Sequence, residues 1–150
     1  METKNFMRLV IPSLSENESF ARVAVGSFLA RMNPTLEQLA DIKTVVSEAV
    51  TNAVVHGYEN TIGEIEIECR VKERQFQMKI TDYGKGIEDV AMARQPFFTT
   101  QEADERSGMG FTVMETFMDK LLVETKPGAG TTLWLEKHIS MAGAGEKDNP

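Results

Sequence analysis

Three polar side chains recur at four-residue spacing late in a long apolar-periodic segment: Glu48, Asn52 and His56. On an α-helix, residues four apart lie on one stripe of the surface. The amide oxygen of Asn52 is a ligand suited to a hard cation such as Mg²⁺, and the carboxylate of Glu48 offers a base. Beside a buried face such groups cost desolvation unless something satisfies them. Taken alone, the triplet indicates either a functional site or a solvated helix face.

The sequence D-Y-G-K-G at residues 82–86 follows directly on a predicted strand. Asp82 continues the inward-facing set of that strand, where a carboxylate is costly without a partner. It could accept a hydrogen bond from an exocyclic amine in a pocket. Gly84 and Gly86 allow positive φ and a close backbone approach to a ligand. The alternative is a tight turn that binds nothing.

Two further segments combine glycine with polar side chains. The sequence R-S-G-M-G-F at 106–111 opens a predicted helix, and the free N–H groups of a helix N-terminus suit phosphates. Arg106 can reach a terminal phosphate as a charged fork, although glycine-rich helix starts are common and the chain has no Walker A sequence. At residues 130–132 the hydroxyl of Thr131 could hold a base edge, or the segment is a turn before a strand.

Hydrophobic periodicity predicts the elements that carry these groups. Residues 5–11 alternate and end at Pro12, which indicates an edge or interface strand because both faces are apolar. Capping boxes at 15–18 and 35–38 start two helices, the first ending near Met32 and the second at Gly57. The core stripe predicted for the first helix consists of Phe20, Val23, Ala24, Ser27, Phe28 and Arg31.

Two hairpins and a long connection follow. Residues 64–82 and 120–138 alternate as β-hairpins, and 109–118 has helical spacing. The connection 83–110, with a short helix near 90–94, is too long for an idle loop. This order predicts one α+β domain over 1–140, a two-layer sandwich with helices on one face of a mixed, mostly antiparallel sheet. The other sheet face would need partial cover, as by a partner chain, and 141–150 is expected to fray.

Composition excludes several classes of protein. Sixteen Lys and Arg against 23 Asp and Glu give a net charge of -7, which argues against a general binder of nucleic acid or anionic membranes but leaves a local basic patch open. No apolar run approaches a membrane span, and no signal peptide pattern is present. The single cysteine, Cys69, cannot form an internal disulfide and is predicted to be a buried apolar residue. We therefore expect a cytoplasmic location.

The motifs that begin at Glu48, Asp82, Gly108 and Gly130, in this order, resemble the four boxes of the GHKL ATP-binding family. The resemblance spans residues 35–137 and implies the GHKL (Bergerat) fold.

A narrower resemblance is carried by segments 15–23, 48–53, 56–58 and 105–111, which are similar to the sporulation anti-sigma F factors of endospore-forming bacteria. This resemblance implies an anti-sigma factor that is also a serine protein kinase. Such a protein would bind and inhibit a sporulation sigma factor, and it would use Mg-ATP to phosphorylate a serine of its anti-anti-sigma factor.

Carried over residue by residue, the resemblance implies a role for each motif. Asn52 would coordinate the Mg²⁺ that bridges the phosphates of ATP or ADP, and Glu48 would take the proton from the attacking hydroxyl. Asp82 would read the adenine amine with help from Thr131. Gly84 and Gly86 would admit the base, and residues 95–110 would form a lid whose Arg106 contacts the γ-phosphate. Further nucleotide contacts would come from Thr99, Thr100, Ser107, Gly108, Met109, Gly110 and Phe111.

Two roles stay open at this point. His56 would either support the site or contact the ligand. Arg22 would either belong to the docking surface for sigma factor and anti-anti-sigma factor or be a solvated helix cation. The N-terminal strand and first helix are expected to form a homodimer.

Other functions share the same boxes. A histidine kinase would need a phosphoacceptor hairpin, and a gyrase- or MutL-type ATPase would need a transducer domain; the chain shows neither. A sigma-binding module without kinase activity is the remaining alternative, and the intact Glu48 and Asn52 argue against it.

Overall fold

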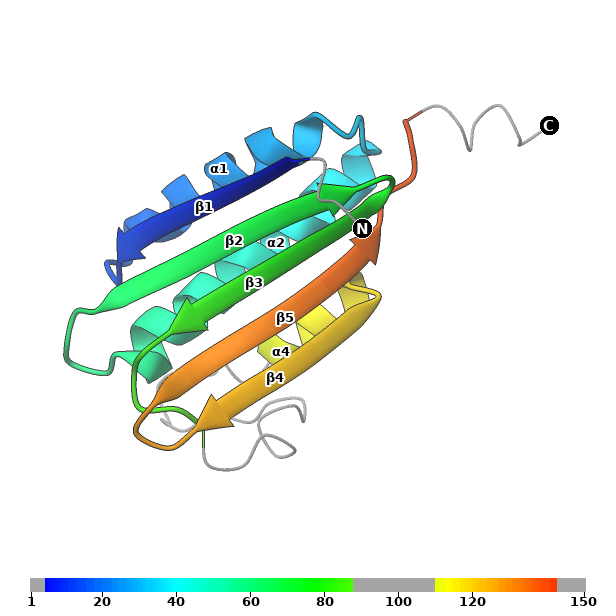
Figure 1. Cartoon of the computed structure of the whole chain (residues 1–150). Coiled ribbons are helices and arrows are strands. Elements are labelled where there is room, and N and C mark those ends of the chain that lie inside the picture. The colour runs from blue at the N-terminus through cyan, green and yellow to red at the C-terminus, as the bar shows by residue number, and fades with distance from the viewer. Residues whose placement is uncertain (1–4, 88–109, 143–150) are drawn as a thin grey trace.

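Five strands and the helices that cover them form two layers (Figure 1). The computed structural model describes residues 5–87 and 110–142. Its strands are β1 (Asn5–Pro12), β2 (Glu64–Lys72), β3 (Gln75–Asp82), β4 (Lys120–Lys126) and β5 (Gly130–His138). Its helices are α1 (Asn17–Ala30), α2 (Leu36–Asn52), the π-helical η1 (Ala53–Gly57) and α4 (Gly110–Phe117).

The sheet has the strand order β1-β2-β3-β5-β4, and each neighbouring pair is antiparallel. The helices α1, α2 and α4 lie on the same face of this sheet (Figure 1). The predicted α+β two-layer sandwich is therefore confirmed, with a sheet that is antiparallel at every described pairing rather than mixed. Within residues 5–87 and 110–142, no helix is long and apolar enough to cross a membrane.

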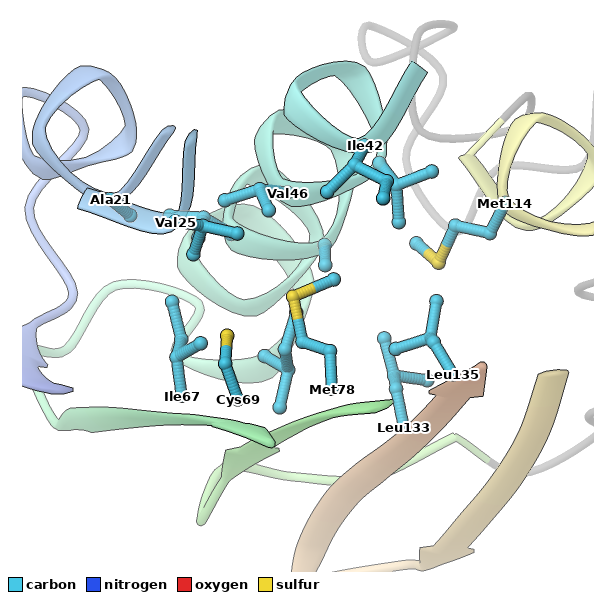
Figure 2. Close-up of a cluster of buried hydrophobic side chains, with 14 of the residues drawn as sticks. Ala21, Val25, Ile42, Val46, Ile67, Cys69, Met78, Met114, Leu133 and Leu135 are labelled. Atoms are coloured by element: carbon cyan, nitrogen blue, oxygen red, sulfur yellow. The ribbon is translucent and has the colours of Figure 1, made fainter. Parts of the chain in front are cut away.

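The period-two alternation of the hairpins produces one apolar sheet face, and the core lies between that face and the helices. Cys69 pairs with Met78 and Ile67 pairs with Ile80, and all four side chains are buried. Figure 2 shows Ile67, Cys69 and Met78 pointing from the sheet toward Val46 of α2. Burial raises the pKa of the Cys69 thiol to about 12. Cys69 is thus an unreactive core residue, as predicted.

The core stripe predicted for α1 is wrong except at Phe28, which packs against the core. Phe20 and Val23 are 54% and 58% exposed, and the buried residues are Ala21, Val25 and Leu29. Of the other predicted core residues, Ser27 and Arg31 are exposed and Ala24 and Phe28 are half-buried. The helix is apolar on more than one side, so periodicity alone did not identify the inward stripe. The side chains that face inward are spaced four apart, and they leave Phe20 and Val23 in solvent.

Only one of the two predicted capping boxes forms, and it forms in part. The hydroxyl of Thr35 caps α2 by accepting a hydrogen bond from the Gln38 amide at 3.1 Å. The side chain of Gln38 does not return to Thr35 but donates to the carbonyl of His138 at 3.2 Å. At the start of α1 no side chain caps the helix. There Glu18 accepts a hydrogen bond from Arg22 instead, so the first capping box is wrong.

The chain beyond β5 is fastened to the turn between β2 and β3 and to the connection between α1 and α2. Arg74 donates to the carbonyls of Ile139 at 2.9 Å and Met32 at 2.6 Å, and the Ile139 amide donates to the carbonyl of Arg74 at 2.8 Å. The amide of Ala142 donates to the carbonyl of Asn33 at 2.7 Å. Residues 141 and 142 were predicted to fray and are instead hydrogen-bonded or bridged. The rest of that predicted tail lies outside the described residues.

The sheet face that points away from the helices carries long charged side chains. Arg8 forms an ion pair with Glu66 at 2.9 Å. The ammonium of Lys79 lies 4.7 Å from the ring centroid of Trp134. Lysine and arginine stems shield apolar surface while their charged ends stay in water. Phe6 and Val10 lie on the same face of β1 as Arg8 and are 61% and 45% exposed, so cover by a partner chain stays a prediction for this face.

The exposed face of α1 can be tested with two matched valine truncations. Val25→Ala removes two buried methyl groups and should lower the free energy of unfolding by about 2 kcal/mol. Val23→Ala removes the same atoms from an exposed position and should change it by less than about 0.5 kcal/mol. Equilibrium unfolding in urea measures both. A larger loss at Val23 than at Val25 would mean that the helix faces the other way.

Candidate functional site

The helix α2 positions two of the predicted site residues beside the core. Its buried residues recur at helical spacing and are Ile42, Val45, Val46, Ala49 and Val50. Glu48 and Asn52 are four residues apart on this helix, so they share a stripe next to its core-facing side. Both side chains are half-buried.

The helix does not continue as an α-helix to Gly57. Residues 53–57 form the π-helical turn η1, in which the Tyr58 amide donates to the carbonyl of Ala53 at 2.9 Å. The sequence predicted α-helical spacing throughout. His56 therefore lies on a wider turn, and its half-buried side chain does not extend the regular stripe of Glu48 and Asn52. Single π-turns inside helices are frequent at functional sites.

Asn52 is the polar side chain whose surroundings are least satisfied. Its Oδ1 and Nδ2 atoms are both buried, and neither has a hydrogen-bond partner among the residues that the structure describes. A buried amide without hydrogen-bond partners costs roughly 1–3 kcal/mol of stability. A native protein therefore keeps one where a ligand or another group supplies those partners. The Oδ1 atom is a suitable Mg²⁺ ligand. Because the described residues contain no cluster of His, Cys, Asp or Glu that could cage a metal, such an ion would need phosphate oxygens and water for its other ligands.

Asp82 lies at the end of β3, opposite Thr131 of β5 and against the last residue of η1. Its Oδ1 accepts a hydrogen bond from the Gly84 amide at 3.0 Å. Burial raises the pKa of Asp82 above its ordinary value, while hydrogen bonds from the backbone of Gly84 and Thr131 oppose the shift. The ends of η1, β3 and β5 thus meet at one end of the molecule and place a buried carboxylate there (Figure 1).

The two glycines after Asp82 are required by the chain's own backbone. A Cβ at Gly84 would lie 2.0 Å from the carbonyl oxygen of Gly57, and the neighbouring Lys85 amide donates to that same oxygen at 2.9 Å. Gly86 has φ +77°, and a Cβ there would lie 2.3 Å from the carbonyl oxygen of Lys126. The predicted positive φ is therefore confirmed for Gly86 and not for Gly84. Both glycines let the backbone after β3 pack directly against the backbone of Gly57 and Lys126.

A cavity of about 240 Å³ opens where β3, β5 and β4 end, and its lining includes Asp82 and Thr131. The hydroxyl of Thr131 lies 2.9 Å from that of Thr125, and the Thr125 hydroxyl accepts a hydrogen bond from the Ile87 amide at 2.8 Å. Pockets for small ligands usually span about 300–1,000 Å³. This cavity is large enough for part of such a ligand, with a carboxylate and a hydroxyl in its wall.

Comparison with known proteins gives this arrangement a family. Residues 11–137 match the model of the histidine kinase-like ATPase domain. The anti-sigma F factor of Thermoanaerobacter sp. (strain X514) is 54% identical over 139 residues, which cover 93% of this chain and 97% of that protein. The anti-sigma F factor of Bacillus subtilis (strain 168) is 53% identical over 142 residues, with 94% and 97% covered. The chain belongs to the anti-sigma F factor family.

Solved structures support the fold of this anti-sigma F factor family member. The RsbU and RsbW domains of a Mycobacterium tuberculosis protein share its fold with a TM-score of 0.68 and 18% identity, covering 92% of this chain and 33% of that one. The catalytic domain of the histidine kinase ThkA gives a TM-score of 0.55 at 19% identity, covering 90% and 96%. At such identities the likeness concerns the fold alone.

The structure brings together some of the predicted site residues of this family member. Glu48, Asn52 and His56 lie on the continuous segment α2–η1, and Asp82 and Thr131 pair across β3 and β5. Gly110 begins α4, where Phe111 is buried in the core, and Arg22 lies on α1. The predicted residues that lie outside the described ranges are Thr99, Thr100, Arg106, Ser107, Gly108 and Met109. The predicted helix near 90–94 and most of the predicted lid lie outside them too.

Sequence reasoning missed two hydroxyl groups at this corner. Tyr58 accepts a hydrogen bond from the Tyr83 amide, next to Asp82, at 2.6 Å. Thr125 contacts Thr131 across the last hairpin. Thr125 could have been found by pairing the two strands about their turn, whereas Tyr58 follows η1 in a segment whose periodicity says nothing of its partners.

The buried carboxylate predicts a conflict between stability and binding. Because the pKa of Asp82 is raised by folding, its contribution to stability is present below the ordinary Asp pKa of about 4 and is lost as the pH rises through the raised value. Asp82→Asn should therefore raise the free energy of unfolding of the ligand-free protein at pH 7, and the gain should vanish below about pH 4. The same change should weaken adenine nucleotide binding roughly 10- to 100-fold.

Urea unfolding across pH and titration with ADP measure the two effects. Asp41→Asn, which neutralises a carboxylate on α2 away from this corner, is the matched control and should leave ADP binding unchanged. A ligand-free Asp82→Asn protein that is less stable than wild type at pH 7 would contradict the prediction.

Proposed function

We propose that this protein is an anti-sigma factor and an ATP-dependent serine protein kinase. It binds and inhibits a sporulation sigma factor, and it uses Mg-ATP to phosphorylate a serine of its anti-anti-sigma factor. The proposal rests on the family and on one observation above the others. The buried amide of Asn52 lacks a hydrogen-bond partner among the described residues, and it follows the carboxylate of Glu48 by one helical turn.

Each end of the nucleotide has a chemically suited partner. The carboxylate of Asp82 accepts a hydrogen bond from the exocyclic amine of adenine, and Thr131 lies beside it on the neighbouring strand. The Oδ1 atom of Asn52 would hold Mg²⁺, which would neutralise charge on the phosphates. One segment, α2–η1, therefore carries the metal ligand and also contacts the turn that reads the base through the hydrogen bond from Lys85 to Gly57.

The reaction is an in-line transfer of the γ-phosphoryl group to a serine hydroxyl of the partner. Glu48 accepts the proton of that hydroxyl while the new oxygen–phosphorus bond forms. The bond between the γ-phosphorus and its bridging oxygen breaks, and ADP is the product. Phosphoryl transfer needs little covalent participation from the protein, so catalysis comes mainly from positioning the reactants and neutralising their charge.

Two substitutions on α2 separate chemistry from binding. Glu48→Ala should lower phosphoryl transfer by at least roughly 100-fold, because general bases contribute about 10²–10⁴-fold, while ATP affinity stays within about 2-fold. Asn52→Ala should weaken Mg-ATP binding by roughly 10-fold or more. Glu37→Ala, at the exposed start of the same helix, is the control and should change neither.

Transfer of labelled γ-phosphate measures these effects with the purified anti-anti-sigma factor and ATP. Label on a partner serine supports the kinase. Free phosphate without labelled partner would indicate an ATPase, and absence of turnover would indicate a nucleotide-regulated binding module. Full transfer activity in Glu48→Ala would remove Glu48 from the role of base.

The docking surface in this proposal is the outer side of α1. Phe20 and Val23 are exposed there and lie three residues apart on one side of the helix. Arg22 lies toward α2, where its guanidinium donates to Glu18 at 2.9 Å and to Ser47 of α2 at 3.2 Å. A half-exposed ion pair such as that of Arg22 and Glu18 contributes little stability. Arg22 can therefore exchange Glu18 for an acidic group of a partner at small cost, and a partner that also covers Phe20 and Val23 would bury two apolar side chains.

The homodimer in this proposal uses the neighbouring edge of the sheet. The strand β1 is an edge strand whose outer backbone groups pair with no other described strand. Such an edge is a template for association. Phe6 and Val10 are exposed along it. Two copies joined through β1 would place their two α1 helices on the same side of the dimer.

A charge-matched pair on α1 tests the docking surface. Arg22→Ala should weaken binding of the sigma factor roughly 10- to 100-fold, as expected for an arginine at the centre of an interface. Arg31→Ala removes an exposed cation from the end of the same helix and should leave binding within about 2-fold. Sedimentation velocity with the purified sigma factor measures both affinities and shows whether the chain alone is a dimer. Equal losses in the two variants would indicate a general charge effect.

A further inference from the structure

One phenolic hydroxyl joins the two parts of the nucleotide site. We infer that Tyr58 is a positioning residue for base recognition, because its hydroxyl holds the turn that carries Asp82 to the helical segment that carries Asn52. This inference rests on the proposed function, since it concerns the site at which adenine binds.

The hydroxyl of Tyr58 occupies a position in the sheet ladder. The pairing of β2 with β3 ends at Ile65 with Asp82, so the next pair in that register would be Glu64 with Tyr83. Instead of bonding each other, the Tyr83 amide donates to the Tyr58 oxygen at 2.6 Å, and the Tyr58 hydroxyl donates to the Glu64 carbonyl at 2.5 Å. A side chain from the helical layer thus stands between two strands at the point where Asp82 ends β3.

The ring of Tyr58 is held as firmly as its hydroxyl. Tyr58 is buried, and a Cβ at Gly63 would lie 2.2 Å from its Cε1, so only glycine fits beneath the ring. Gly63 is in turn bonded to Ser13 at the end of β1. Its amide donates to the Ser13 hydroxyl at 3.0 Å, and its carbonyl accepts from the Ser13 amide at 2.8 Å. The phenol therefore has one orientation available to it.

This arrangement fixes Asp82 relative to Asn52. Tyr58 and Gly57 are consecutive residues, and Gly57 ends the segment that begins one residue after Asn52. Tyr58 bonds the backbone after Asp82, and Gly57 accepts from Lys85 on the other side of the turn. The two contacts set the distance between the carboxylate that reads the base and the amide that holds the metal. A ligand with adenine at one end and phosphates at the other needs that distance to be constant.

Removing the hydroxyl tests this role. Tyr58→Phe leaves the Tyr83 amide and the Glu64 carbonyl without their shared partner, so the turn after Asp82 can shift. ADP affinity should fall roughly 10-fold, and the preference for ADP over GDP should narrow by about the same factor, because Asp82 no longer stands in a fixed place. The rate of phosphoryl transfer at saturating ATP should stay within about 2-fold, since Glu48 is untouched.

Thr44→Val is the control. It removes a hydroxyl that donates to the Ala40 carbonyl on the exposed side of α2, away from the cavity, and it should leave the affinities and their ratio unchanged. An equal loss of ADP and GDP affinity in Tyr58→Phe, or no loss, would overturn the inference. If wild-type protein binds neither nucleotide, the proposed function fails and the inference fails with it. If the wild type binds ADP and Tyr58→Phe leaves the ratio of ADP to GDP affinity unchanged, the inference fails and the proposed function stands.

A measurement on the native protein covers the case in which Tyr58→Phe does not fold. The Tyr83 amide lies beyond the last pair of β2 and β3, and its described acceptor is the Tyr58 hydroxyl. In ligand-free wild type its hydrogen exchange should be slowed to the range of the paired amides of β3. Exchange as fast as that of an exposed turn would overturn the inference.

Discussion

The meeting of β3 with the end of the long helix is the contact on which the site depends. The carbonyl of Gly57 accepts the Lys85 amide at 2.9 Å, and no side chain fits at Gly84 between them. The helix and the strand are each anchored by core residues, such as Val50 and Ile80. The corner therefore takes its geometry from the core. A buried carboxylate can be kept there, although its burial raises its pKa, because the backbone around it cannot relax.

The helix α2 belongs to the proposed nucleotide site and to the proposed docking surface at once. Asn52 and Glu48 lie on the stripe beside the core, and Ser47 accepts a hydrogen bond from Arg22 of α1. The proposed docking residue is thus bonded to the residue that precedes the proposed base. A partner that draws Arg22 away from Ser47 would remove this contact with α2, and binding at the surface of α1 would then reach the helix that carries the proposed base. The two functions proposed for the chain share this one element.

Most of the fold could be predicted because the sheet residues alternate cleanly. Ile65, Ile67 and Cys69 specify one buried face of β2, and a one-residue slip against β3 would turn them outward. The helix α1 could not be oriented in the same way, since Phe20 and Val23 are apolar and yet exposed. Their exposure depends on how close α1 approaches α2, a property of tertiary packing that periodicity does not contain.

The candidate site could likewise be predicted only in part. Glu48, Asn52 and Asp82 could be selected from residue type and spacing, because a polar group at an inward position is conspicuous in a sequence. The π-turn η1 could not, since the spacing of its residues in the sequence is that of a continued α-helix. Tyr58 was missed for a related reason. Its hydroxyl is satisfied by backbone groups of β2 and of the turn after β3, and backbone partners leave no trace in side-chain patterns.

The hydrogen bonds of Arg74 and Ala142 lie at the end of the sheet opposite Asp82 (Figure 1). Toward Asp82 the structure instead holds the buried amide of Asn52, which has no partner among residues 5–87 and 110–142, and a buried carboxylate. The two ends therefore differ in their buried side chains, while the backbone at both ends is hydrogen-bonded. A bound nucleotide would supply partners to the amide at the Asp82 end, so that occupancy and stability rise together.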